Sequence, residues 1–395
     1  MYGFMKEQRA IFIIDILKNI INVYFDTFFV FYFFKVANYE VLPLAKYYIS
    51  LYLFIVIGFF AIRNAMKKNL KVPYFRIGIS MQALYIAAIM LLKDDIINYI
   101  IPVGILKGLA DGFYHFPKNI LNSDKISNEA RQKFSGMINI INKVMSIIIP
   151  IVLGVVLTFM SYTDLGKIFF LLFVVMFIVS FGIKDEYKGV KKFEVRKFIN
   201  LVKKNKDVRA SMMVPFLSGL TYSSGVMGTI VTLSKINNFK TNLNLGIVDS
   251  ICAAVSLLIC ILFAMKIKRK SFRNLLLVSG IASFISLVFL GVYPSMVSLV
   301  VYLLVRYSFI LLINLISDNV VVNLSNDKKL KSSLKAEYFF SRDVIFSISR
   351  CLGYLILIIV CATVGMEYIN YILIVAGVSL LIEAILVGNL STKQS

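Results

Sequence analysis

The sequence predicts an all-α integral membrane protein with twelve transmembrane helices in two pseudo-symmetric six-helix bundles. Three observations support this fold class: an apolar composition, regularly spaced apolar stretches, and a similarity between the two halves of the chain. Of the 395 residues, 59% are hydrophobic and 16% are charged, with a mean hydropathy of +0.83, whereas soluble domains are about half apolar and a quarter charged. Because one span takes roughly 20 apolar residues, the chain has room for about twelve spans and for no separate soluble catalytic domain.

The apolar stretches place the spans in order along the chain. Each is close to the length that crosses a bilayer as a helix. Asp15 and Lys18 interrupt the first stretch, and no small-residue cleavage site follows it, so we expect a retained span rather than a removed signal peptide. The predicted spans are residues 11–34, 41–62, 74–92, 97–121, 136–160, 165–183, 208–233, 244–265, 273–293, 296–323, 340–364 and 367–389.

The basic residues are distributed unevenly between the predicted loops. The formal net charge is +22, and most of the 43 Lys and Arg residues fall at the termini and in every second loop. By the positive-inside rule, both termini are expected in the cytoplasm, with the chain crossing the cell membrane many times. This distribution accounts for the basic charge without a nucleic-acid partner. The alternate loops hold only Lys35, Lys46, Lys93, Lys167, Lys235 and Lys240.

The longest connection follows the sixth predicted span and is strongly basic. Within residues 184–207, Val195, Phe198, Ile199 and Val202 have the spacing of one helix face. We interpret the segment as an amphipathic helix on the inner membrane surface or as a solvated linker. Either interpretation makes it the boundary between bundles at 1–183 and 208–395.

The two halves also resemble each other at a constant offset of 203 residues. Phe60 and Ala61 open one basic loop, and Phe263 and Ala264 open the corresponding loop of the second half. The polar positions of the first and fourth spans likewise fall on polar positions of the seventh and tenth. Each match is short, but their common offset predicts two six-span halves of the same fold.

Polar residues inside the spans concentrate in the first, fourth, seventh and tenth. A charge at the bilayer centre costs roughly 2.5–3.5 kcal/mol, so such side chains are expected to face a bundle interior or an aqueous cavity. On the fourth span, Lys107, Asp111 and His115 recur every four residues, and so do Gly104, Gly108 and Gly112. The first series predicts a polar stripe, and the second permits close helix approach.

These stripes supply the candidate functional residues. Carboxyl groups in a partly dry cavity bind protons more readily, and the single His titrates near neutrality when exposed, so the proton-coupling candidates are Asp26, Asp111 and His115. The substrate-cavity candidates are Asn19, Asn22, Lys107, Tyr222, Thr229, Arg306, Asn314 and Asp318. Near the cytoplasmic ends, the candidates for gate or inter-half pairs are Lys143, Arg342, Asp343 and Arg350.

An alternative is that these charges only neutralise one another in structural ion pairs. Asp15 with Lys18, and Lys107 with Asp111, have suitable spacing within one helix. Taken together, the charged residues of the predicted pathway come close to neutrality, which disfavours a strongly polyanionic substrate. The four Cys residues lie in apolar runs without metal-ligand spacing, so no metal or cofactor is expected.

The architecture resembles the major facilitator superfamily of secondary transporters over essentially the whole chain. The family has a loop signature with a Gly, an Ala-Asp-Arg triplet, a second Gly and two basic residues. The corresponding segment keeps the first Gly, the Ala, the Arg and the basic pair, but has Ile for the Asp and Ala for the second Gly. It reads Gly58-Phe59-Phe60-Ala61-Ile62-Arg63-Asn64-Ala65-Met66-Lys67-Lys68.

The resemblance implies alternating access without ATP or covalent chemistry, and it adds Gly58 and Arg63 to the gate candidates. Neither a phosphate-binding loop nor a nucleophile elbow occurs in the sequence, so no enzymatic activity is expected. We expect a monomeric transporter of a small organic solute, contacting membrane lipids, coupled to protons and favouring efflux. The alternatives are a lipid or glycolipid flippase of the same fold, and a non-transporting membrane receptor or assembly factor, whose function would survive Asp26→Asn or Asp111→Asn.

Overall fold

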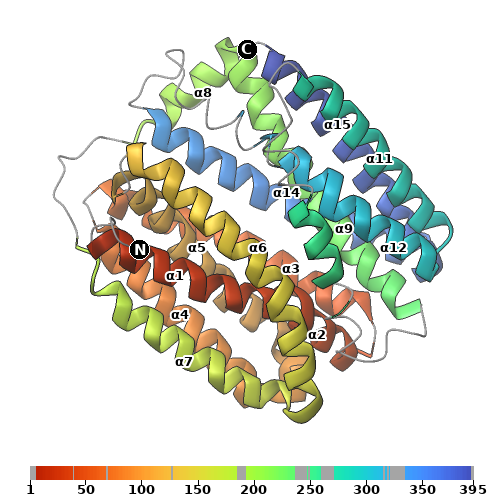
Figure 1. Cartoon of the computed structure of the whole chain (residues 1–395), viewed down its shortest axis with the longest axis horizontal. Coiled ribbons are helices and arrows are strands. Elements are labelled where there is room, and N and C mark those ends of the chain that lie inside the picture. The colour runs from red at the N-terminus through yellow and green to blue at the C-terminus, as the bar shows by residue number, and fades with distance from the viewer. Residues whose placement is uncertain are drawn as a thin grey trace. The chain divides into compact units, whose positions relative to one another are not determined.

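The computed structural model describes residues 6–38, 40–67, 70–125, 128–184, 193–235, 247, 250–258, 271–314, 316–317, 320 and 334–392. Their regular secondary structure is entirely helical (Figure 1). The chain divides into two compact units, of which the first runs to Phe193 and includes residues 240–251. The second unit holds Glu194–Phe239 and the chain from Cys252 onward.

The first unit is built from long apolar helices joined by short connections. A π-helical segment interrupts the first of them, and a 3-10 segment precedes the fourth long helix. The elements are α1 (Lys6–Val23), η1 (Tyr24–Phe29), α2 (Val30–Val36), α3 (Val41–Lys67), α4 (Lys71–Leu92), η2 (Lys93–Tyr99), α5 (Ile100–Lys125), α6 (Asn128–Phe159) and α7 (Tyr162–Ser180).

The second unit begins with a short amphipathic helix and continues with long apolar ones. A second π-helical segment follows α12. The elements are α8 (Val195–Lys204), α9 (Lys206–Lys235), α11 (Phe272–Val292), α12 (Met296–Val305), η4 (Arg306–Ile310), α14 (Lys335–Thr363), η6 (Met366–Tyr371) and α15 (Ile372–Thr392).

Helices lie where the sequence predicts most of the spans. Within the described residues, seven helical segments are long and apolar enough to cross a membrane, one of them the continuous stretch Lys71–Asn122. Much of the predicted span 244–265, and the end of the predicted span 296–323, lie outside the described residues. The all-helical membrane class is therefore confirmed, and the count of twelve stays a prediction.

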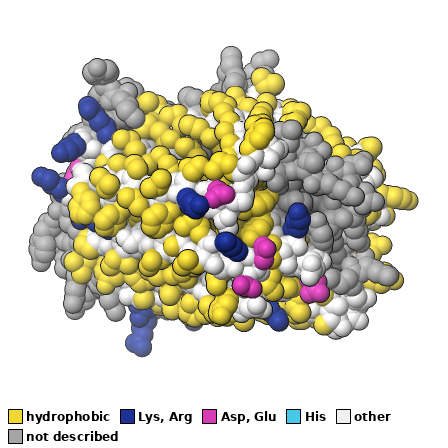
Figure 2. Space-filling model, turned by 90° about the horizontal axis from the view of Figure 1, so that it is seen from below, with side chains coloured by type: hydrophobic (Ala, Val, Ile, Leu, Met, Phe, Trp, Pro, Cys, Tyr) yellow, Lys and Arg dark blue, Asp and Glu magenta, His cyan; other side chains and the backbone are white. Residues whose placement is uncertain are grey.

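The outer helix faces are apolar, as a lipid-facing surface requires. Leu91 and Phe159 expose 83% and 85% of their surface, and Leu171, Ile178 and Ile285 expose more than half of theirs. Figure 2 shows apolar side chains over most of the described surface on the face in view, with few charged ones.

Close backbone contact joins α5 to α3 in the first unit. A Cβ atom on Gly104 would meet the hydroxyl of Ser50, and one on Gly108 would meet the carbonyl oxygen of Leu51. A Cβ on Gly112 would lie 3.2 Å from the Cα of Gly58. Because only glycine leaves room for this approach, the glycine series of the fourth predicted span is a packing feature.

The same helix pairs recur in both units. In the first, α1 packs against α6 and α7, and α4 packs against α7. In the second, α9 packs against α14 and α15, and α11 packs against α15. In the order of the predicted spans, each unit therefore pairs its first helix with its fifth and sixth, and its third with its sixth.

The basic connection between the sixth and seventh predicted spans contains the short helix α8. Phe198 is buried in a cluster with Val208, Met212 and Tyr338, whereas the adjacent Ile199 exposes 46% of its surface. The backbone N–H of Glu194 donates to a carboxylate oxygen of Glu337 at 2.7 Å. The apolar face of α8 is thus partly covered by α9 and α14 of its own unit.

Candidate functional site

A buried network of charged and amide groups connects α1, α4 and α5 in the first unit. Lys107 Nζ lies 2.7 Å from Asp111 Oδ1, one helical turn away on α5. Gln82 Nε2 donates to the same carboxylate oxygen at 3.2 Å, and Gln82 Oε1 accepts from Lys18 Nζ at 2.5 Å. Because Lys18, Gln82 and Asp111 are all buried, these hydrogen bonds offset the cost of removing two charged groups and one amide from water.

A second ion pair joins α1 to α5. Lys118 Nζ pairs with Asp15 Oδ1. The ring centre of Tyr114 lies 5.4 Å from the ammonium group of Lys18 and 5.7 Å from that of Lys118. Aromatic faces at this distance attract cations. Asp15 is therefore held by a lysine of another helix.

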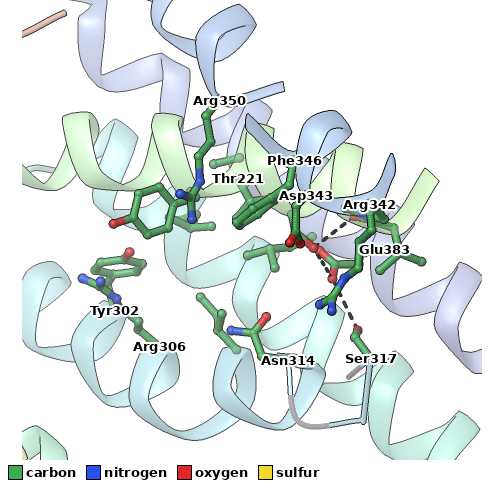
Figure 3. Close-up of a pocket in the computed structure, with 18 residues that line it drawn as sticks. Thr221, Tyr302, Arg306, Asn314, Ser317, Arg342, Asp343, Phe346, Arg350 and Glu383 are labelled. Atoms are coloured by element: carbon green, nitrogen blue, oxygen red, sulfur yellow. Dashed lines mark hydrogen bonds between the residues drawn. The ribbon is translucent and has the colours of Figure 1, made fainter. Parts of the chain in front are cut away.

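The second unit contains a pocket of about 510 Å³, a volume in the usual range for small-molecule sites (Figure 3). Its wall comes from α9, α11, the predicted tenth span, α14 and α15, and it combines charged, hydroxyl and aromatic groups. The lining residues are Val214, Pro215, Ser218, Thr221, Tyr222, Leu287, Tyr302, Arg306, Ile310, Asn314, Ser317, Arg342, Asp343, Phe346, Arg350, Ala376, Leu380 and Glu383.

Arginine and aromatic side chains form one end of this pocket. The guanidinium of Arg350 lies 4.0 Å from the ring centre of Tyr222 and 3.8 Å from that of Phe346. Figure 3 shows Arg306 and Tyr302 at the same end as Arg350. Arg306 is the first residue of the π-helical η4, and such π segments are rare and frequently occur at functional sites.

Carboxylates lie at the other end of the pocket. Glu383 on α15 is 1% exposed, and its Oε1 accepts hydrogen bonds from Ser218 Oγ at 2.7 Å and Ser317 Oγ at 3.4 Å. Figure 3 shows Arg342 and Asp343 at this end. Glu383 thus links α9, the tenth predicted span and α15.

The structure distributes the predicted site residues over both units. In the first unit, Lys107 and Asp111 form the ion pair, the ring of His115 contacts Tyr114 edge-on at 5.1 Å, and Asn19 and Asn22 are half-buried on α1. In the second unit, the candidates that line the pocket are Tyr222, Arg306, Asn314, Arg342, Asp343 and Arg350.

Some gate candidates have a different setting from the one expected for them. Arg342, Asp343 and Arg350 lie in the pocket wall. Gly58 packs on Gly112, and the guanidinium of Arg63 lies 5.1 Å from the ring centre of Phe60. The candidates outside the described part of the chain are the side chains of Asp26, Lys143 and Thr229, and residue Asp318.

Sequence reasoning missed Gln82, Lys118 and Glu383. Gln82 and Glu383 belong to predicted spans that hold few polar residues, and their helices carry no polar stripe. A single polar residue in an otherwise apolar span is rare, because a polar group inside the membrane needs partners. That rarity could have identified Gln82 and Glu383 from the sequence. Among the described residues, no cluster of three or more His, Cys, Asp or Glu side chains has the geometry to hold a metal ion.

Comparisons with known proteins point to a transporter fold. No family model matches the chain. An uncharacterized protein of Bacillus subtilis (strain 168), YqgE, is 24% identical over 266 residues, which span 66% of this chain and 61% of that protein. The match thus covers less than two thirds of the relative's length.

Solved structures match nearly the full chain. The nucleoside transporter NupG aligns with a TM-score of 0.69 at 14% identity, over 98% of this chain and 99% of that one. The human organic anion transporter MFSD10 (TETRAN) aligns at 0.64 and 10% identity, over 97% and 99%. A variant of the E. coli fucose:proton symporter FucP aligns at 0.58 and 12% identity, over 96% and 97%.

All three structures belong to transporters rather than enzymes. Each of them aligns with almost the whole of this chain, which indicates a common fold. The chain therefore has the same fold as these three transporters.

Proposed function

We propose that this protein is a secondary transporter that moves a small organic solute across the cell membrane by alternating access. The observation that carries the proposal is the pocket of about 510 Å³ in the second unit, which places arginines, carboxylates and hydroxyls among membrane-spanning helices. Charged groups are costly inside a membrane and mark solute or ion pathways. The similarity in fold to transporters of nucleosides, organic anions and fucose supports the same function.

We further propose that transport is coupled to protons and runs outward. Asp111 and Glu383 are the described carboxylates that support coupling, because both are buried among hydrogen-bond donors within the helices. Asp111 accepts from Lys107 and Gln82, and Glu383 accepts from Ser218. A carboxyl group that exchanges its partners for a proton during the cycle would couple proton movement to solute movement.

The test uses the purified full-length protein in liposomes with a pH-sensitive dye inside. Cationic, neutral and anionic solutes are added outside while the lumen is acidic. Antiport predicts that an accepted solute raises the lumenal pH as protons leave, whereas symport predicts that the lumenal pH falls. Asp111→Asn is expected to abolish the solute-dependent signal.

Asp164→Asn is the matched control, because Asp164 lies at the exposed start of α7 and pairs with Lys167. It is expected to retain the signal of the unmodified protein. If no solute of any charge moves or shifts lumenal pH in well-folded protein, the transport proposal is wrong. If solute moves without any proton flux, transport stands and coupling is wrong.

A further inference from the structure

The pocket of the second unit has an uneven distribution of charge. Three arginines and two carboxylates line it, leaving one net positive charge. Arg342 and Arg350 are two turns apart on α14, a separation of about 12 Å along the helix axis. Figure 3 shows Arg350 with Arg306 at one end, and Arg342 with Asp343 and Glu383 at the other.

The chain direction of the helices explains this separation. Consecutive spans are expected to cross the membrane in opposite directions, so the order of levels along the tenth span is reversed along the eleventh. Arg306 precedes Ser317 on the tenth span, and Arg342 precedes Arg350 on the eleventh, so Arg306 lies toward the level of Arg350 and Ser317 toward that of Arg342. The cationic end therefore combines residues of two helices that are fixed by the fold.

Arg350 is held in a defined orientation. Its guanidinium lies between the rings of Tyr222 and Phe346, with ring centres at 4.0 and 3.8 Å. Contact with two aromatic rings restricts the orientation of the group. A planar guanidinium in a fixed orientation matches the two oxygens of a carboxylate, with which it forms paired charge-assisted hydrogen bonds.

The rings around Arg350 also favour an unsaturated solute. Tyr222, Tyr302 and Phe346 line the same pocket, and flat apolar groups pack on such rings at little entropic cost. The carboxylates of Asp343 and Glu383 lie at the other end and outnumber the one arginine there, Arg342, so a second anionic group would meet net negative charge. The pocket thus suits one anionic group rather than two.

We propose that the substrate bound by this pocket is an aromatic monocarboxylate, with its carboxylate on Arg350 and Arg306 and its ring against Tyr222, Tyr302 and Phe346. This inference rests on the proposed transport function and specifies its substrate class. The hydroxyl-rich end near Glu383 accommodates hydroxyl or amino substituents of the solute, through the acceptor oxygens of Asp343 and Glu383.

The test measures binding to the purified full-length protein by isothermal titration calorimetry. The probes are benzoate, indole-3-acetate and naphthalene-2-carboxylate, each compared with its primary amide, together with naphthalene-2,6-dicarboxylate. At least one monocarboxylate is expected to bind about tenfold or more tightly than its amide, because the amide lacks the charge that strengthens the guanidinium contact. The dicarboxylate is expected to bind more weakly than the naphthalene monocarboxylate.

Three variants locate the contact. Arg350→Gln is expected to lose about tenfold or more in affinity for the monocarboxylate. Arg350→Lys keeps the positive charge but loses the paired N–H donors of the guanidinium. Its affinity for the monocarboxylate is therefore expected to lie between those of the unmodified protein and Arg350→Gln. Arg273→Gln is the control, since Arg273 is an exposed arginine at the start of α11 outside the pocket, and it is expected to bind as the unmodified protein does.

Several outcomes would overturn the inference. These are an amide that binds as tightly as its acid, a dicarboxylate that binds more tightly than the monocarboxylate, or no binding of any of the three acids. The wild-type comparison of acid with amide does not depend on the folding of a variant. Transport of a neutral or cationic solute in the liposome assay would leave the transport proposal standing while this one fails.

Discussion

Glu383 shows how a single carboxylate is accommodated inside a membrane protein. Its Oε1 accepts from the hydroxyls of Ser218 and Ser317, and its surface is almost completely buried. These hydroxyl donors come from two other helices, so the side chain also ties α9 and the tenth predicted span to α15. Its position in the pocket wall gives it both a structural and a functional role in the proposed transport cycle.

The effect of replacing Glu383 on stability is expected to depend on whether the new side chain can still accept hydrogen bonds from the two serines. Glu383→Leu leaves the two serine donors without their acceptor and is expected to destabilise the fold by about 1–3 kcal/mol. Glu383→Gln keeps an amide oxygen and is expected to cost less. Thermal unfolding of the detergent-solubilised protein measures both, and equal melting temperatures for Leu and Gln would contradict this role.

The ion pair of Asp15 and Lys118 is expected to be strongly coupled. Removing one partner leaves the other charged and largely buried, which costs about 3–5 kcal/mol, whereas removing both costs less. Asp15→Asn, Lys118→Met and the double variant therefore form a thermodynamic cycle in thermal unfolding. Additive effects of the two substitutions would show that the pair contributes no coupling.

At the scale of elements, the contact between α3 and α5 depends on glycine. A Cβ atom on Gly108 would meet the carbonyl oxygen of Leu51 and would lie 2.9 Å from the Cβ of Phe54. The backbone of α3 cannot yield as a flexible side chain can. The two helices would therefore have to move apart to admit a larger residue.

Gly108→Ala is accordingly expected to destabilise the protein by about 1–3 kcal/mol through overpacking. Gly388→Ala is the matched control, because the nearest atom to its new Cβ would be 3.6 Å away, an ordinary contact. Thermal unfolding should show a lower melting temperature for Gly108→Ala alone. Similar melting temperatures for the two variants would contradict the close contact.

The position of α8 depends on one aromatic side chain. Phe198→Ala removes a ring buried with Val208, Met212 and Tyr338 and is expected to release α8 from the unit, at a cost of about 3–5 kcal/mol. Hydrogen exchange should become faster throughout α8. Ile199→Ala alters the adjacent, half-exposed residue and is expected to leave exchange unchanged, so faster exchange in both variants would contradict the specific role of Phe198.

At the scale of the whole molecule, the basic loops predict the orientation in the membrane. In a variant without native cysteines, Ser161→Cys between α6 and α7 is expected to react with an impermeant maleimide added to intact cells. Lys204→Cys at the end of α8 is expected to react only after the cells are opened, since its loop is rich in Lys and Arg. The reverse labelling pattern would contradict the predicted orientation.

Local spacing predicted the features that depend on one helix. The pairing of Lys107 with Asp111 follows from their separation by four residues. The glycines of α5 likewise share one face at the same interval, and their close packing on α3 agrees with that pattern. Both features require only that the segment be helical, and the apolar stretches predicted its helical structure.

Partners on other helices were not predictable in this way. Asp15 pairs with Lys118, and Glu383 accepts from Ser218 and Ser317, although no sequence interval relates these residues. Their partners depend on which helices are neighbours and on how each is rotated about its axis. The choice of neighbouring helices and the rotation of each helix depend on the packing of many side chains at once. A single sequence does not reveal that packing.

The sequence by itself therefore determined the membrane class, the position of most helices and the polar faces of several, because hydropathy and helical periodicity are local properties. The tertiary structure decided which polar groups meet. It brought Arg306 and Arg350 to one end of a pocket and Asp343 and Glu383 to the other. The physical reason is that buried charges need partners at hydrogen-bond distance, and only the packed arrangement of the helices supplies them.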